Sequence, residues 1–368
     1  MSARAAAVAA FLLSGFPILA GVVQTRTGRL SGAVSVRDGA LAVDGKVVPV
    51  KDVLFAVFDA PGRTFRSPNT VRLTSGEVWH CEVLALQAGK LKLRSPYFGT
   101  KEVAREGVRS LEFREKVPPE EGLGADTLYR EEGEPLPGKL LWISSTQVAV
   151  DSPLGAMAMD RSEVTRFILS KAAPAAATTG HCEVALCDGS VVRGTLKLAA
   201  GEVVVTHEEL GELAVPVRAV RSLLCHAPGC VYLAEMALDT AASPLLAATP
   251  SIRTVHRRAG GQADAAAGYV RALVIQPSTK LTVRLPGKAP GVFRATVSAV
   301  DAARGPARLR ITAGGKALIS RTVEPSVGPP EAISVELTGE TMAIEVLFED
   351  TPKFPCGVVL GDPHVVRP

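Results

Sequence analysis

Aromatic residues are scarce in this chain of 368 residues, and no segment is strongly basic. Phe, Trp and Tyr together make up 5% of the composition. The 41 Lys and Arg residues are interspersed with the 37 Asp and Glu residues, which leaves a net charge of +4 without a Lys/Arg cluster. Because proteins that bind nucleic acid usually carry a basic patch that matches the phosphate backbone, we expect no nucleic-acid partner.

Recognisable catalytic motifs are also absent. The sequence contains no G-x-S-x-G, no H-E-x-x-H, no P-loop and no G-x-G-x-x-G. His80, His207, His256 and His364 are isolated along the chain, and no two carboxylates stand out as an acid–base pair. The sequence therefore predicts a protein that is not an enzyme and that needs no cofactor.

The longest apolar run lies at the N-terminus. Arg4 is the only charged residue before Arg26, and the segment from Ala5 to Ala20 is apolar and ends in small residues. This pattern is typical of a secretory signal peptide, here residues 1–21, so we expect export to the periplasm, the cell envelope or the medium. An uncleaved N-terminal anchor is the alternative. No other stretch reaches the roughly 18 apolar residues of a transmembrane helix, so we expect no membrane span in the mature chain.

Short strands and tight turns dominate the next two hundred or so residues. Val- and Leu-rich segments alternate with turns that hold many of the 34 Gly and 26 Pro residues. The clearest segment, 182–225, is typical of five strands joined by turns such as Asp188-Gly189. Its closing strand recurs about every 55 residues, which indicates an internal repeat. The four copies of this closing strand are 53–57, 108–113, 164–169 and 220–224.

The repeats predict an all-β region of small β-meanders at 22–60 (a degenerate copy), 68–116, 125–171 and 180–227. A unit of this size has exposed sheet edges and a thin core. Each unit can curl into a small closed barrel of the Sm-like type, or neighbouring units can pair their edges into a longer assembly. Because Pro-rich linkers fall between the units, we expect separate barrels that act as spacer or interaction modules.

Six cysteines are present, and four of them form two Cys-x4-Cys pairs, Cys182 with Cys187 and Cys225 with Cys230. In an exported chain a disulfide among these four is the leading expectation, and spacing leaves the pairing open. Cys182 and Cys187 fall on opposite faces of one strand, so they should not bridge each other. His181 and His226 stand directly beside Cys182 and Cys225, so a structural zinc site built from these cysteines and histidines is one alternative. Buried free thiols are another. Cys81 stands where sister repeats have glycine, so we expect it to pack in a core.

From about Val231 the repeat stops, and strands at about 8–12-residue spacing predict a β-sandwich of jelly-roll type over 230–368. Six sequence blocks follow one another there: VYLAEMALD, GYVRALVIQPSTKLTVRLPG, FRATVSAVD, ITAGGKALISRTV, ISVELTGETMAIEVLFED and GVVLGDPHVV. In order and spacing these blocks resemble the NPCBM family of carbohydrate-binding modules, of the glycosyl hydrolase family 98 type. The resemblance implies a galactose-binding-like β-sandwich.

The same resemblance implies that the C-terminal domain binds carbohydrate. Ala272, Gln276 and Leu360 stand where the family has Gly, His and Trp. Sugar recognition combines an aromatic face with a few directional polar groups. The candidate platform residues are Tyr269 and Phe354, and the candidate polar ligands are Arg271, Gln276, Asp301 and Asp350.

We therefore expect an exported, non-catalytic protein with a C-terminal carbohydrate-binding module and a β-repeat region that acts as spacer or interaction surface. Carbohydrate and protein partners both fit this expectation. The alternative is a structural protein of the envelope, or a protein–protein interaction module, that binds no sugar.

Overall fold

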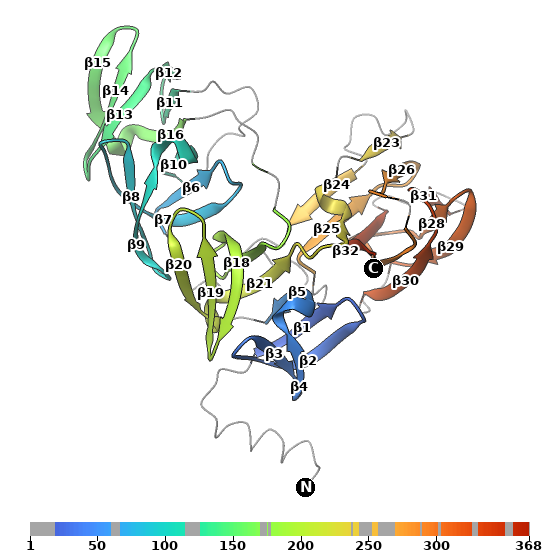
Figure 1. Cartoon of the computed structure of the whole chain (residues 1–368). Coiled ribbons are helices and arrows are strands. Elements are labelled where there is room, and N and C mark those ends of the chain that lie inside the picture. Colours follow the sequence, from blue (N-terminus) through green and yellow to red (C-terminus); the bar gives the residue numbers. More distant parts are fainter. Residues whose placement is uncertain are drawn as a thin grey trace. The chain divides into compact units, whose positions relative to one another are not determined.

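All regular structure in the described part of the chain is β-strand or short 3-10 turn (Figure 1). The structure is a computed structural model that describes residues 19–59, 67–114, 126–169, 175, 178–236, 238–242, 252–256, 269–287, 289–300, 303–325, 330–349 and 356–367. The chain divides into two compact units, Met1–Cys225 and His226–Pro368. The prediction of an all-β protein is confirmed. Within the described ranges, no helix has the length and apolar character to cross a membrane.

Four copies of a β-meander make up the N-terminal unit, with five strands in repeats 1, 2 and 4 and six in repeat 3. In each copy a 3-10 turn leads into the closing strand. Repeat 1 comprises β1 (Leu19–Thr25), β2 (Arg29–Arg37), β3 (Ala40–Val43), β4 (Lys46–Pro49), η1 (Val50–Asp52) and β5 (Val53–Phe58). Repeat 2 comprises β6 (Asn69–Leu73), β7 (Val78–Gln87), β8 (Lys90–Ser95), β9 (Gly99–Ala104), η2 (Arg105–Gly107) and β10 (Val108–Glu112). Repeat 3 comprises β11 (Thr127–Arg130), β12 (Leu136–Pro137), β13 (Lys139–Ile143), β14 (Gln147–Ser152), β15 (Gly155–Asp160), η3 (Arg161–Glu163) and β16 (Val164–Ile168). Repeat 4 comprises β17 (Cys182–Leu186), β18 (Val191–Ala199), β19 (Glu202–His207), β20 (Gly211–Pro216), η4 (Val217–Ala219) and β21 (Val220–Cys225).

The first strand of each repeat pairs antiparallel with the second and the last strand of the same repeat. This holds for β1 with β2 and β5, and for β17 with β18 and β21. The remaining strands continue as a meander, as β18, β19 and β20 do. Side chains alternate between the two faces of each strand, so in β8 Leu91 and Leu93 are buried while Lys92 between them is exposed.

The repeats are joined to one another through their closing strands. β5 of repeat 1 pairs with β21 of repeat 4, with Ala56 opposite Leu223. β10 of repeat 2 pairs with β16 of repeat 3, with Leu111 opposite Phe167. Repeats 1 and 4 accordingly share one hydrophobic core, and repeats 2 and 3 share another. The expectation of separate units is wrong, because edge strands with apolar side chains on both faces are stabilised by pairing with each other.

The C-terminal unit is built from two antiparallel sheets. One sheet has the order β24-β25-β32-β27-β30, and β22 pairs with β32. The other has the order β23-β26-β31-β28-β29. The strands of the first sheet are β22 (Cys230–Tyr232), β24 (Ile252–His256), β25 (Arg271–Ile275), β27 (Gly291–Ala299), β30 (Glu331–Leu337) and β32 (Val358–Val366), and η5 (Leu233–Glu235) follows β22. The strands of the second sheet are β23 (Asp239–Ala242), β26 (Thr279–Arg284), β28 (Ala307–Ala313), β29 (Lys316–Val323) and β31 (Thr341–Phe348).

A single core fills the space between these two sheets. Leu273 of the first sheet and Leu309 and Ile311 of the second are fully buried in it. Along β28 the intervening residues Arg308 and Arg310 are exposed, which is the alternation of a sheet with one face toward the core. The C-terminal unit is therefore a β-sandwich.

The predicted signal segment, residues 1–21, overlaps the first strand. Leu19, Ala20 and Gly21 pair with β2, and Gly21 also lies opposite Phe58 of β5. A cleavage after Gly21 would therefore shorten β1 by three residues. Residues 1–18, which hold most of the predicted segment, lie outside the described part of the chain.

Candidate functional site

The six predicted ligand residues of the C-terminal unit do not form one cluster. Tyr269 and Gln276 flank β25 at its two ends. Because a strand rises about 3.3 Å per residue, their backbones are separated by roughly 23 Å. Three further candidates, Asp301, Asp350 and Phe354, lie outside the described residues. The described part of the structure therefore offers two separate places for a ligand.

Gln276 lies where β25, β27 and β32 meet. Ile275 at the end of β25 and Ala299 at the end of β27 both face Val358, the first residue of β32. The Val300 N–H donates a hydrogen bond of 3.2 Å to the Gly357 carbonyl in the same corner. The side chain of Gln276 is half-buried there. In sequence, this corner adjoins the positions of Asp301 and Phe354.

Tyr269 lies at the opposite end of β25, against the backbone of β32. A Cβ atom placed on Gly361 would come within 3.2 Å of Tyr269 Cβ and Cδ1, so the absence of a side chain at Gly361 makes room for the tyrosine. Tyr269 itself is half-buried, which leaves part of it accessible. Among the described candidates it is the one aromatic residue of the predicted site.

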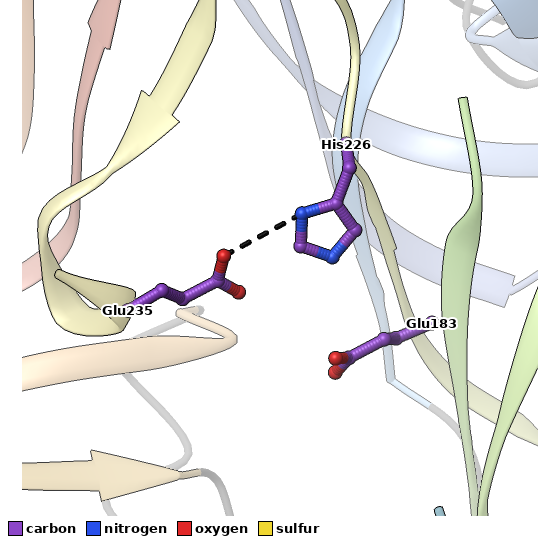
Figure 2. Close-up of side chains that lie close together, drawn as sticks. All are labelled: Glu183, His226 and Glu235. Atoms are coloured by element: carbon purple, nitrogen blue, oxygen red, sulfur yellow. Dashed lines mark ion pairs between the residues drawn. The ribbon is translucent and has the colours of Figure 1, made fainter. Parts of the chain in front are cut away.

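Arg271, the neighbouring candidate, is buried and has a partner within the protein. The residue is 8% exposed, and its guanidinium forms an ion pair with Glu235 of η5. Glu235 also lies 3.5 Å from Nδ1 of His226, as Figure 2 shows. The geometry gives Arg271 a structural role in joining β25 to η5.

Asp362 fixes the start of β25. It was not among the ligand residues predicted from the sequence. Its Oδ1 accepts hydrogen bonds from the backbone N–H groups of Val270, at 2.7 Å, and Arg271, at 2.9 Å. It is 4% exposed and has a φ of 45°, in the left-handed region where Asp is one of the better-tolerated residues. The Asp362-Pro363 pair in the last sequence block was the available signal for this residue.

His364 and Tyr232, two buried residues beside Asp362, are both uncharged near neutral pH. Burial lowers the pKa of His364 to about 4, against a smaller opposing effect of its hydrogen bond to the Asp362 carbonyl. Burial, with the nearby Cys230 thiol, raises the pKa of Tyr232 well above its usual value. Neither group changes charge near neutral pH, so this cluster supports the fold rather than acid–base chemistry.

The His226–Glu235 pair does not favour a metal site. Within the C-terminal unit, His226 and Glu235 offer two ligating side chains, whereas protein zinc sites use three or four. Glu183, also labelled in Figure 2, belongs to the N-terminal unit, where its carboxylate pairs with Arg193 at 2.6 Å.

The cysteines of repeat 4 form a disulfide. Cys182 and Cys225 lie opposite each other on β17 and β21 and are bridged, with a Cα–Cα distance of 4.1 Å. Cys187 and Cys230 do not take part in a disulfide. A zinc site that uses all four is therefore excluded, because a disulfide sulfur cannot act as a thiolate ligand. Cys81 is fully buried in the core of repeats 2 and 3, as expected.

Comparisons with known proteins identify carbohydrate-binding modules among similar solved structures. No protein-family model matches the chain, and no curated protein matches it. A CBM51 module from a Clostridium perfringens GH95 protein, in complex with methyl-galactose, is 12% identical; the match covers 37% of this chain and 99% of that one, with a TM-score of 0.30. The CBM51-2 and INT domains of C. perfringens ZmpB, in complex with GlcNAc, are 11% identical over 58% of this chain and 44% of that one, with a TM-score of 0.31. The tandem CBM51 modules of a Streptococcus pneumoniae family 98 glycoside hydrolase are 10% identical over 66% of this chain and 88% of that one, again with a TM-score of 0.31.

Proposed function

We propose that this chain is an exported, non-catalytic protein whose C-terminal β-sandwich binds carbohydrate. The observation that carries the proposal is the correspondence between the six NPCBM-like sequence blocks and the strands of the sandwich. The block that begins at Gly268 supplies β25 and β26, and the block that begins at Ile333 supplies most of β30 and all of β31. The last block supplies β32, which includes Asp362.

Tyr269 is the residue to which we assign direct sugar contact. Aromatic side chains bind sugars by packing against the apolar C–H face of the ring, and directional polar groups then fix its orientation. Tyr269 is half-buried and packs against β32 at Gly361, which has no side chain to displace it. The Asp362 carboxylate determines where the chain enters β25 next to it. The tyrosine therefore has a fixed position before any ligand arrives, which lowers the entropic cost of binding.

A glycan array probed with the full chain tests this proposal. We expect at least one glycan to be bound, and we expect Tyr269→Ala to weaken that binding about tenfold or more, since one aromatic contact and its ordering are lost. Tyr129→Ala is the matched control, because Tyr129 is equally half-buried but lies in repeat 3. A folded wild-type chain that binds no glycan on the array would contradict the proposal.

The repeats are assigned the role of a spacer or interaction region, built from small barrel-like modules. Their strands are connected by short turns and share two cores, which makes the region stiff rather than flexible. Repeat 3 also exposes large apolar side chains on β13 and at the β14–β15 turn: Leu141, Trp142 (37% exposed) and Leu154 (85% exposed). Exposed apolar side chains of this size support protein contact as a second function. Sedimentation of the full chain and of Trp142→Ser would reveal self-association that depends on the exposed Trp142.

A further inference from the structure

A cleft of about 610 Å³ lies between repeats 2 and 3, outside the sugar site proposed in the C-terminal unit. One wall comes from repeat 2 and includes Asn69, Glu82 and Phe113. The other wall comes from repeat 3, where the β13–β14 turn contributes Thr146 and the start of η3 contributes Arg161. The volume falls within the range of about 300–1,000 Å³ that is usual for small-molecule sites.

Arg161 lines this cleft and is held in place by contacts to both repeats. Its guanidinium donates hydrogen bonds to the Ser144 carbonyl, at 3.2 Å, and to Asn69 Oδ1, at 3.1 Å. It also lies 5.0 Å from the centre of the Phe113 ring, within cation–π range. The cleft wall is therefore preorganised rather than formed by freely moving side chains.

Asn69 is a buried polar residue that lines the cleft. It is 5% exposed, and its Oδ1 accepts hydrogen bonds from the Val83 N–H, at 2.9 Å, and from Arg161. This orientation leaves the amide NH₂ as a donor with no partner within the described residues. The strand beside it is bulged between Val83 and Ala85, and bulges commonly reshape a strand next to a binding site.

Acceptors complement these donors on both walls. Glu82 uses only Oε2 to bind Arg94, so Oε1 has no partner among the described residues. Asp160 uses only Oδ1, which accepts the backbone N–H and the hydroxyl of Ser162. These hydrogen bonds lower the pKa of Asp160 below its ordinary value, so the carboxylate stays ionised near neutral pH.

The charges that line the cleft cancel. Glu82 and Asp160 are negative, and Arg114 and Arg161 are positive. A strongly anionic or cationic ligand would gain attraction from one pair and repulsion from the other. A neutral polyol, in contrast, can donate to the carboxylates and accept from the amide while its C–H groups pack on the aromatic and aliphatic lining.

The geometry points to this cleft as a binding site for a short, neutral saccharide of about two rings, separate from the site proposed in the C-terminal unit.

Isothermal titration of the full chain with lactose, cellobiose and maltose tests the assignment, with digalacturonic acid as the charged comparison. At least one neutral disaccharide should bind. Ser145→Trp, which places a large side chain at the exposed rim, should abolish that binding, and Glu82→Gln should weaken it about tenfold through loss of a charged acceptor. Glu163→Gln is the control, because Glu163 is an exposed residue of η3 that does not line the cleft.

The variants also separate this site from the C-terminal one. The cleft assignment requires that Tyr269→Ala leaves the disaccharide affinity unchanged. Binding that Tyr269→Ala removes and Ser145→Trp preserves would overturn the assignment while supporting the C-terminal site. Failure of all three neutral disaccharides to bind, or tighter binding of digalacturonic acid than of any neutral sugar, would overturn it as well.

Discussion

Glu77 and His207 form a buried pair that links repeat 2 to repeat 4. The Glu77 side chain is fully buried, and its Oε2 lies 2.9 Å from His207 Nε2. The same carboxylate accepts hydrogen bonds from the Ser75 hydroxyl and from the backbone N–H of Arg193, each at 2.8 Å. A buried carboxylate with this many partners is stable, but the loss of one partner would leave a charge without compensation.

This pair should make the stability of the protein depend on pH. Burial alone would lower the pKa of His207, but the hydrogen bond and the charge of Glu77, with Glu209 and Glu208, outweigh it and raise the pKa above its ordinary value of 6.5. The stabilisation is therefore fully present below the unfolded value of 6.5 and is lost as pH rises through the folded value.

Urea unfolding at pH values on both sides of this window measures the effect. The wild type should lose free energy of unfolding as pH rises, and His207→Gln should show a flatter profile over the same range. Identical pH profiles for the two proteins would show that His207 does not carry the dependence.

The Cys182–Cys225 disulfide is the other residue-level contribution that can be measured. The bridge closes a loop with a sequence separation of 43. Its removal should lower the free energy of unfolding by about 2–4 kcal/mol, because the unfolded chain gains freedom. We expect the double variant Cys182→Ala/Cys225→Ala to unfold at lower urea concentration, whereas Cys230→Ala, which leaves the bridge intact, should lower the midpoint less. Equal urea midpoints for the wild type and the double variant would contradict the bridge.

At the scale of the element, Gly194 permits the close approach of β18 and β19. A Cβ atom at this position would overlap the Thr206 carbonyl and lie 2.8 Å from Val205 Cγ1. Gly194→Ala should therefore cost about 1–3 kcal/mol through overpacking. Gly28→Ala is the matched control, because a Cβ there meets open space, and its effect should stay within about 0.5 kcal/mol. Thermal unfolding followed by circular dichroism gives both values, and equal melting temperatures would refute the steric explanation.

Closing strands determine how the repeats assemble. β5, with the sequence VLFAVF, is buried at all six positions. A strand that is apolar on both faces cannot remain at a solvent-exposed edge, and β21 supplies its partner. The continuous apolar run was the sequence signal for this pairing, although it did not indicate which strand the partner would be.

At the scale of the whole molecule, the two units should behave differently when they are cut. A fragment of residues 226–368 retains a complete core between its two sheets, so we expect it to fold alone and to unfold cooperatively. A fragment of residues 61–225 lacks repeat 1, which would expose β21 and half of a shared core. It should be insoluble or lack cooperative unfolding, as judged by circular dichroism and size-exclusion chromatography. A cooperative, monomeric 61–225 fragment would show that the shared core is dispensable.

Much of the local structure could be predicted from the sequence, because alternation of apolar residues reports which face of a strand is buried. Strands at Ala307–Ala313 and Lys316–Val323 lie where the pattern places them. The ligand residues were harder to predict. Arg271 has the chemistry of a sugar ligand, yet it is buried and forms an ion pair with Glu235, 36 positions earlier. The folded structure brings such a distant partner into contact, so the spacing of neighbouring residues cannot predict it.

The sequence by itself determined that the protein is all-β, that its first part is repetitive and that the repeat stops before its last part. These properties follow from residue periodicity and turn chemistry, which act over a few neighbouring residues. Only the tertiary structure decided that repeat 1 pairs with repeat 4 and repeat 2 with repeat 3, and that a charge-balanced cleft lies between the latter two. Strand pairing between repeats joins residues more than fifty positions apart in the sequence. Whether two such strands pair depends on how well their exposed edges and apolar faces fit together, which local sequence patterns do not report.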